Sequence, residues 1–372
     1  MKYTTIWSAA PSRCETGELA WGCDVTLRYG VYAAVAGNGL RLRLSNRHGK
    51  AAVAVPRVSV ARITDGLAID ETTVTPVPFG CDLIAAGEEA VSDTVSFAVT
   101  AGERFAVSMY IGVPTDLTTS VAAIGPLSDK MAAVGDWAEC ALPPREMQMP
   151  TAWYRLLTGV EVCGEGRTTV CYGDSITAQS WPDRLALRLC EEGVQGRAVA
   201  RMAVSGSRVL GQYNCAHYRH YGVRGTDRFE REVCLPGADS VIVLHGINDL
   251  IHPDGSYYRP MSNLPSADDL IAAFRQHIAI AHAHGLRICL ATITPFGGWR
   301  SDSPEKQAIR AAVNDWIRHS GEADAVADFD AAVCDPDHPE QMAPAYDSGD
   351  RLHPSDAGAA AMAACIPLEF LR

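Results

Sequence analysis

The chain has 372 residues, of which 47% are hydrophobic and 20% charged, and its formal net charge is −12. This length exceeds one ordinary core and the composition is that of a globular protein, so we expect a folded chain of two domains. No cluster of Lys and Arg offsets the negative charge, which argues against a nucleic-acid partner and favours a small or neutral substrate.

The N-terminal stretch MKYTTIWSAAPSRCETG contains no apolar run long enough for a secretory signal peptide, and no later window resembles a membrane span. We therefore expect a cytoplasmic protein with no membrane partner. The twelve cysteines are scattered without a C-x-x-C pair. They are predicted to be free thiols rather than a disulfide framework or a zinc ribbon.

From residue 25 to about residue 160 the chain alternates between apolar and polar residues. The runs LRLRLSN at 40–46, TVSFAVT at 94–100 and RFAVSMYIGV at 104–113 are typical of half-buried strands, and Gly, Asn, Asp and Pro separate them. Long amphipathic helical patterns are missing from this half. The pattern predicts an N-terminal β-sandwich over 1–163.

After residue 163 the rhythm changes to short, continuous apolar runs separated by segments of helix length. Strands are predicted at 168–172, 198–203, 240–245, 286–292 and 325–328, and helices near 181–193, 267–284, 304–320 and 355–370. Alternation of this kind predicts a doubly wound α/β domain over 164–372, with parallel strands buried on both faces.

Polar residues follow the first three predicted strands of this domain. Asp174 and Ser175 follow the first strand, Gly206 the second, and Asn248 the third. Because ligands of open α/β sheets bind outside the carboxyl ends of the strands, these residues are expected to meet in one cleft. An isolated Ser175 would be interpreted as a helix N-cap, but its companions favour a nucleophile.

A base for Ser175 is offered near the C-terminus, where DSGDRLHPSDAG places Asp350 three residues before His353. A helical turn or a tight loop would bring both to one side, so that the carboxylate fixes the imidazole tautomer while the other nitrogen faces Ser175. The Ser175 and Gly206 amides and the Asn248 side chain would then donate to an oxyanion. Asp174 is expected to hydrogen-bond the turn instead, and Asp249 is also expected to be structural.

These residues lie in four ordered blocks, GDSIT, AVSGSRV, GIND and DRLHP, and with them the chain resembles the SGNH (GDSL-type) hydrolases. The resemblance covers about the last 210 residues. It implies a flavodoxin-like three-layer α/β/α domain, Ser175 as nucleophile, His353 as base, Asp350 as its orienting group, and Ser175, Gly206 and Asn248 as the oxyanion hole. It implies neither a metal nor a cofactor. The lack of a G-x-S-x-G elbow argues against the α/β-hydrolase fold.

The N-terminal half is similar to the jelly-roll-like β-sandwich that precedes the catalytic domain in some bacterial carbohydrate acetylesterases. The resulting hypothesis is a serine esterase that removes O-acetyl groups from sugars or oligosaccharides, as a monomer or a homo-oligomer. Two alternatives stay open: a lysophospholipase or short-chain lipid esterase, and a carbohydrate-binding protein on a silent hydrolase scaffold.

The remaining motifs are interpreted as structural. His217 and His220 have metal-compatible spacing but no third ligand nearby, and His282 and His284 are two apart on a predicted helix and cannot share a ligand. Trp181 is predicted to anchor the core, and Cys171 and Cys289 to be buried on strands. Loop aromatics could stack on a sugar or simply pack the loops, namely Trp299, Tyr257 and Tyr258.

Overall fold

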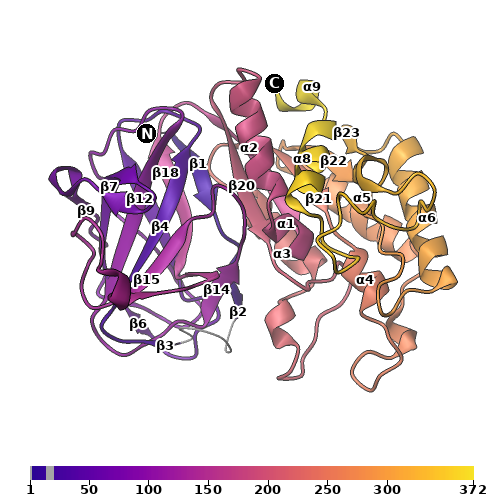
Figure 1. Ribbon diagram of the computed structural model, residues 1–372, viewed down its shortest axis with the longest axis horizontal. Helices are drawn as coiled ribbons and strands as arrows, with labels where there is room; N and C mark the ends of the chain where they lie inside the picture. Colours follow the sequence, from indigo (N-terminus) through magenta and orange to yellow (C-terminus); the bar gives the residue numbers. More distant parts are fainter. Residues whose placement is uncertain (1, 14–20) are drawn as a thin grey trace. The chain divides into compact units, whose positions relative to one another are not determined.

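The computed structural model describes residues 2–13 and 21–372. The chain forms two compact units (Figure 1). The first takes in the chain up to Thr168 together with Leu189–Arg201, and the second takes in Thr169–Arg188 and Met202–Arg372. The predicted domain boundary after residue 163 falls between β18, the last strand of the antiparallel sheets, and β19, the first strand of the α/β sheet.

The first unit consists of antiparallel strands, as predicted for a β-sandwich. One sheet has the order β1-β18-β5-β11, formed by Tyr3–Ser8, Leu157–Cys163, Leu40–Ser45 and Glu89–Val91. The other has the order β16-β15-β4-β12-β7-β8, with β9 paired to β7, formed by Gln148–Met149, Lys130–Val134, Val25–Ala33, Glu103–Ile111, Arg57–Asp65, Ala68–Ile69 and Thr75–Pro76.

The inward side chains of these two sheets make one core. Leu42 and Val160 from the first sheet share an apolar cluster with Leu27, Tyr29 and Val107 from the second, and none of the five exposes measurable side-chain surface. Alternating apolar residues therefore bury one face of each sheet, which is the arrangement that stabilises a sandwich.

Two strand pairs and one three-stranded sheet complete the first unit: β6 with β10 (Val53–Ala54, Leu83–Ile84), β3 with β13 (Trp21–Gly22, Thr115–Asp116), and β2, β14 and β17 (Ser12–Arg13, Thr119–Ala122, Trp153–Arg155). Two 3₁₀ turns lie at Glu71–Thr73 and Arg145–Met147. The predicted strand at 94–100 is wrong as a continuous strand, because only Val95 and Val99 form isolated bridges there.

The α/β part of the chain has a five-stranded sheet of order β20-β19-β21-β22-β23, formed by Arg197–Ala203, Arg167–Gly173, Ala238–Leu244, Arg287–Ala291 and Ala325–Ala327. All five predicted strands are present. β21, β22 and β23 pair in parallel, and their residues are mostly buried, which explains the continuous apolar runs.

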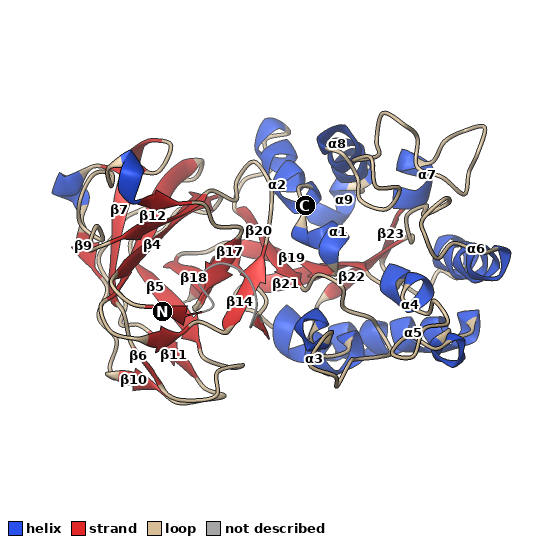
Figure 2. Cartoon of the chain, turned by 60° about the horizontal axis from the view of Figure 1, so that its bottom comes forward, coloured by secondary structure: helices blue, strands red, loops and turns tan. Residues whose placement is uncertain are grey.

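Helices cover both faces of this sheet, so the predicted three-layer α/β/α fold is confirmed. Figure 2 shows α2 (Trp181–Glu191) and α8 (Asp356–Cys365) on one face, and α3 (Gly225–Val233) and α5 (Ala267–Ala283) on the other. The remaining helices are α1 (Ser175–Ala178), α4 (Ile247–Ile251), α6 (Pro304–His319), α7 (Phe329–Val333) and α9 (Leu368–Leu371). Two 3₁₀ turns lie at Arg219–Tyr221 and Met261–Asn263. Within the described ranges, no helix combines the length and the apolar character needed to cross a bilayer.

Candidate active site

Ser175 lies at the first position of α1, directly after β19. The preceding Asp174 caps the helix, because its Oδ1 accepts a hydrogen bond from the Ile176 N–H at 3.1 Å, as predicted for this residue. Gly173 lets the turn pass close to β21: a Cβ there would lie 2.1 Å from the Leu244 carbonyl oxygen. The Gly-Asp-Ser sequence thus ends a buried strand, approaches its neighbour and starts a helix within three residues.

The structure brings Ser175, His353 and Asp350 together in one hydrogen-bonded chain. His353 Nε2 lies 2.9 Å from Ser175 Oγ, and His353 Nδ1 lies 2.6 Å from Asp350 Oδ2. With Asp350 ionised, Nδ1 carries the proton and Nε2 is left to accept the hydroxyl proton of Ser175. This geometry can activate a serine for attack on a carbonyl carbon.

A tight loop holds the acid and the base. Asp350 Oδ1 accepts hydrogen bonds from the backbone N–H groups of Leu352 and His353 at 2.9 and 2.8 Å. Burial alone would raise the pKa of Asp350, but these bonds and the imidazole lower it below its usual value. Arg351 adopts a φ of 64° at the tip of this loop, where its N–H is bonded by Asp347.

The loop after β20 carries Gly206, whose φ of 77° lies in the left-handed region. A Cβ at this position would meet the ring of Tyr221 at 2.0 Å, so both conformation and space require glycine. Over residues 2–13 and 21–372, neither the Gly206 N–H nor the Ser175 N–H donates a hydrogen bond. Both amides are therefore available for a ligand.

Asn248 lies in α4, which starts after Gly246 (φ 112°) at the end of β21. Its Nδ2 donates one hydrogen bond to the Ser207 carbonyl oxygen at 3.0 Å, which orients the amide and leaves a second N–H free. Asp249 is structural, as predicted: it accepts the N–H groups of Val209 and Leu210 at 2.7 and 3.0 Å. Burial raises the pKa of Asp249 to about 6.

A buried arginine, which the sequence analysis did not single out, joins the nucleophile turn to the Gly206 loop. Arg228 Nη2 donates to the Gly173 carbonyl oxygen at 2.7 Å and to Ser207 Oγ at 3.0 Å, while Nη1 bonds Glu232 at 2.5 Å. His245 Nε2 lies 3.0 Å from the same Ser207 hydroxyl. The Arg-x-x-x-Glu spacing on α3 was a signal for an ion pair, but not for its burial beneath the site.

Other candidate residues lie outside this hydrogen-bonded chain. His282 Nε2 contacts Asp324 at 2.9 Å and His284 Nε2 contacts Glu230 at 2.7 Å, so the two histidines face different partners. Trp181 is fully buried against Phe329, as predicted for a core anchor. Cys171 and Cys289 are buried as predicted. Among the described residues no three His, Cys, Asp or Glu side chains are grouped to hold a metal.

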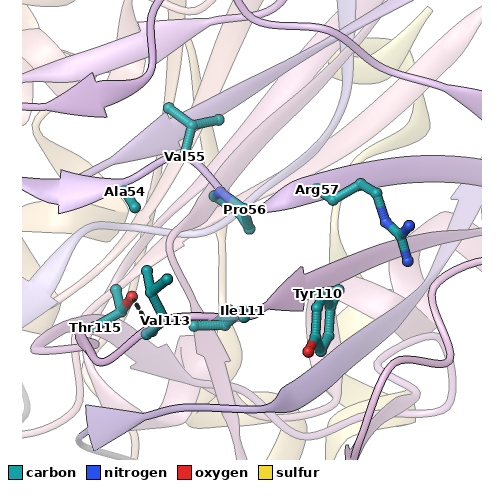
Figure 3. Close-up of a pocket in the computed structure, with 9 residues that line it drawn as sticks. Ala54, Val55, Pro56, Arg57, Tyr110, Ile111, Val113 and Thr115 are labelled. Carbon is teal, nitrogen blue, oxygen red and sulfur yellow. Dashed lines mark hydrogen bonds between the residues drawn. The ribbon is translucent and has the colours of Figure 1, made fainter.

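A cavity of about 370 Å³ lies within the first unit (Figure 3). It lies between the start of β7 and the end of β12, and it contains none of the predicted site residues. Its wall is mostly aliphatic, with the ring of Tyr110 and the guanidinium of Arg57 at one end. Tyr110 donates to Asp24 and Arg57 pairs with Asp136, so the polar groups of this cavity are already partnered.

Comparisons with known proteins match one family model and several solved structures. The model of the GDSL-like Lipase/Acylhydrolase family matches residues 171–361. Among solved structures, a GDSL-like lipase from Bacteroides thetaiotaomicron is 17% identical, with a TM-score of 0.40 over 55% of this chain and 88% of that one. Axe2, an acetylxylan esterase from Geobacillus stearothermophilus, is 22% identical, with a TM-score of 0.41 over 54% and 93%. No curated protein matches the chain.

Proposed function

The chain belongs to the GDSL-like lipase/acylhydrolase family, and from that membership we propose that it hydrolyses carboxylic esters through an acyl-enzyme on Ser175. The observation that carries the proposal is the hydrogen-bonded chain of Ser175 Oγ, His353 and Asp350, with distances of 2.9 and 2.6 Å. Such a chain supplies a nucleophile, its base and the group that orients the base.

In the proposed reaction Ser175 Oγ attacks the ester carbonyl carbon while His353 Nε2 takes its proton. The oxyanion that forms accepts hydrogen bonds from the N–H groups of Ser175 and Gly206 and from the free Asn248 N–H. The carbonyl then re-forms, the C–O bond to the alcohol breaks, and His353 returns its proton to the leaving oxygen. Water, deprotonated by His353, releases the acid from Ser175 in the same way.

Within this class we propose an O-acetylesterase of sugars, acting in the cytoplasm. The support is the group of tyrosine rings beside Gly206, since sugar rings stack on aromatic faces and Tyr221 packs directly on this loop. The lipid-esterase alternative predicts instead a preference for long acyl chains. Cleavage of eight-carbon p-nitrophenyl esters far faster than the acetate would contradict the acetylesterase proposal.

The test of the nucleophile compares wild type with Ser175→Ala on p-nitrophenyl acetate. We expect a burst of one nitrophenolate per chain in wild type, and a loss of about 10³-fold or more in kcat in the variant. Ser180→Ala, a few residues downstream, is the matched control and should behave as wild type. Equal activity of wild type and Ser175→Ala would exclude Ser175 as the nucleophile, and no activity in either would favour the silent-scaffold alternative.

A further inference from the structure

Four rings form a contiguous cluster beside Gly206: Tyr213, Tyr218, Tyr221 and His252. Tyr221 covers the Cα of Gly206, and Tyr218 stacks on Tyr221 with a centroid distance of 5.7 Å and an interplanar angle of 13°. His252 lies 4.9 Å from Tyr221 and 5.7 Å from Tyr213. His252 directly follows α4, the helix of Asn248, so the cluster adjoins both loops that carry proposed oxyanion donors.

Two arginines lie on the outer rings of this cluster. The guanidinium carbon of Arg208 is 4.5 Å from the Tyr213 ring centroid, and that of Arg259 is 4.2 Å from the Tyr218 centroid. Gly211 makes room for Arg208, whose guanidinium would clash with a Cβ there at 2.5 Å. Stacking therefore fixes the orientation of both guanidinium groups without using their N–H donors.

Both side chains are largely buried, and the Nε–H of each is buried without an acceptor among the described residues. Arg208 and Arg259 are each 7% exposed, and within residues 2–13 and 21–372 their guanidinium groups donate no hydrogen bond. Arg259 has only a distant ion pair with Asp254, at 3.7 Å. Other buried arginines of the described chain do use their donors, namely Arg28, Arg155, Arg228 and Arg310. The terminal N–H groups of Arg208 and Arg259 keep accessible surface and have no protein acceptor in the described ranges, so they can donate to a bound anion.

The local charge has the opposite sign to that of the whole chain. Burial, together with the positive charges of Arg259, Arg208 and Arg300, lowers the pKa of His252 to about 3. Two carboxylates, Asp249 and Asp254, lie near these positive charges. Asp249 is occupied by two backbone N–H groups, and Asp254 accepts the Ser256 N–H while facing Arg259. Three cations thus converge in a protein whose net charge is −12.

We propose that Arg208 and Arg259 form a subsite for an anionic oxygen group on the alcohol part of the ester, a carboxylate or a phosphate carried by an O-acetylated sugar. The tyrosine rings would pack against the sugar, and the two guanidinium groups would bind the anion through parallel N–H donors. This inference rests on the proposed function, because it places the anion next to the ester that Ser175 attacks.

The substrate test compares acetylated sugars that differ only in charge. We expect kcat/KM for O-acetylated methyl galacturonoside, or for O-acetylated galactose 6-phosphate, to exceed that for O-acetylated methyl galactoside by about tenfold or more. The better of the two charged sugars identifies the anion. Faster cleavage of a lysophosphatidate than of either sugar would overturn the assignment to a sugar, and equal rates on all three sugars would overturn the subsite.

The variant test uses Arg208→Gln and Arg259→Gln. Each is expected to lower the ratio of charged-sugar to neutral-sugar kcat/KM by about 10- to 100-fold, since a charged hydrogen bond is lost. Arg275→Gln, which removes an exposed guanidinium paired with Glu322, is the matched control and should leave the ratio unchanged. A ratio unchanged in both cluster variants would overturn the proposal. Arg259→Lys should keep part of the preference for charged sugars that Arg259→Gln loses.

Direct binding separates this inference from the proposed function. Calorimetry of the Ser175→Ala chain with galacturonate and with galactose measures the subsite without turnover, and we expect galacturonate to bind about tenfold more tightly. If galacturonate and galactose bind equally well and wild type hydrolyses p-nitrophenyl acetate, the subsite is excluded and the proposed function stands. If galacturonate binds tightly but wild type cleaves no ester, the proposed function is excluded and the anion subsite is supported.

Discussion

At the scale of single residues, the Asp350 carboxylate is fully used. One oxygen accepts the His353 Nδ1–H, and the other accepts two backbone N–H groups and the Ser348 hydroxyl. A neutral amide at this position would present an N–H to one of these donors. The ionised carboxylate therefore fixes both the loop and the imidazole tautomer.

Asp350→Asn is expected to lower kcat on p-nitrophenyl acetate by about 10²- to 10⁴-fold with little change in KM, because the wrong tautomer is stabilised. Steady-state kinetics checks this. Asp356→Asn, which breaks only a surface pair with Arg184, should keep wild-type rates. A kcat of Asp350→Asn within twofold of wild type would show that Asp350 does not orient the base.

Asp174 makes stability depend on pH. Burial raises its pKa to about 7, although the Ile176 N–H and Arg228 oppose the shift. The native state keeps the Asp174 proton to a higher pH than the unfolded chain does. The stability that the protonated Asp174 contributes is therefore present near pH 4 and is lost as the pH rises through 7.

Asp174→Asn keeps an oxygen for the helix cap and removes this titration. The unfolding free energy of the variant minus that of wild type should therefore increase between pH 4 and pH 8, by an amount on the order of a few kcal/mol. Urea denaturation at several pH values measures it. The exposed Asp82→Asn is the control, and parallel pH curves for Asp174→Asn and wild type would contradict the prediction.

At the scale of elements, the Gly206 loop is shaped by its contact with the 3₁₀ turn Arg219–Tyr221. Gly206→Ala should cost about 1–3 kcal/mol in stability, from a φ of 77° and the Tyr221 ring, and about 10²-fold or more in kcat. Adding Tyr221→Ala makes room for the new methyl group. A double-mutant cycle of unfolding free energies should therefore show coupling, and strictly additive values would contradict the contact.

Periodicity predicted the elements that are long and buried. The helices at Ala267–Ala283 and Pro304–His319 begin at the predicted residues, since a Ser N-cap precedes each of them, and they end within one residue of the prediction. The predicted C-terminal helix is two helices, because Pro367 interrupts it between Cys365 and Leu368. A helix start was predicted at Ser175, but α4 was not predicted, since five residues carry no periodic signal.

The candidate site was predictable where chemistry is local in sequence. Ser175, Gly206, Asn248 and the Asp350–His353 pair each follow a strand or share a loop, so topology alone brought them to one place. The support beneath them was not predictable. Arg228 reaches Gly173, 55 residues away in sequence, and no spacing rule gives that contact. The Arg208 and Arg259 stacks are equally non-local.

At the scale of the whole molecule, the chain relies on two cores rather than on cross-links. Every cysteine that the structure describes is a free thiol. Cys23, Cys81, Cys190 and Cys234 are exposed, whereas Cys171 and Cys289 are buried, and burial raises the pKa of the Cys289 thiol. Reactivity of these groups should follow exposure.

In a Cys14→Ser background, Ellman's reagent is expected to modify the exposed thiols of the native protein within minutes, and Cys171 and Cys289 only after denaturation. Mass mapping of the modified peptides checks which thiols react. Early labelling of Cys289 would show that the core of the second unit opens readily. Labelling that does not reach Cys81 would contradict its exposure.

The acid and the base share one seven-residue loop, Asp347 to His353, closed by a bond from the Ser348 N–H to the His353 carbonyl oxygen at 2.9 Å. The bond between Asp350 and His353 is made within this loop, whereas the bond to Ser175 depends on where the sheet places the serine. An insertion or deletion outside the loop that keeps its two ends in place leaves the acid–base pair intact, but one that moves the loop breaks its bond to Ser175.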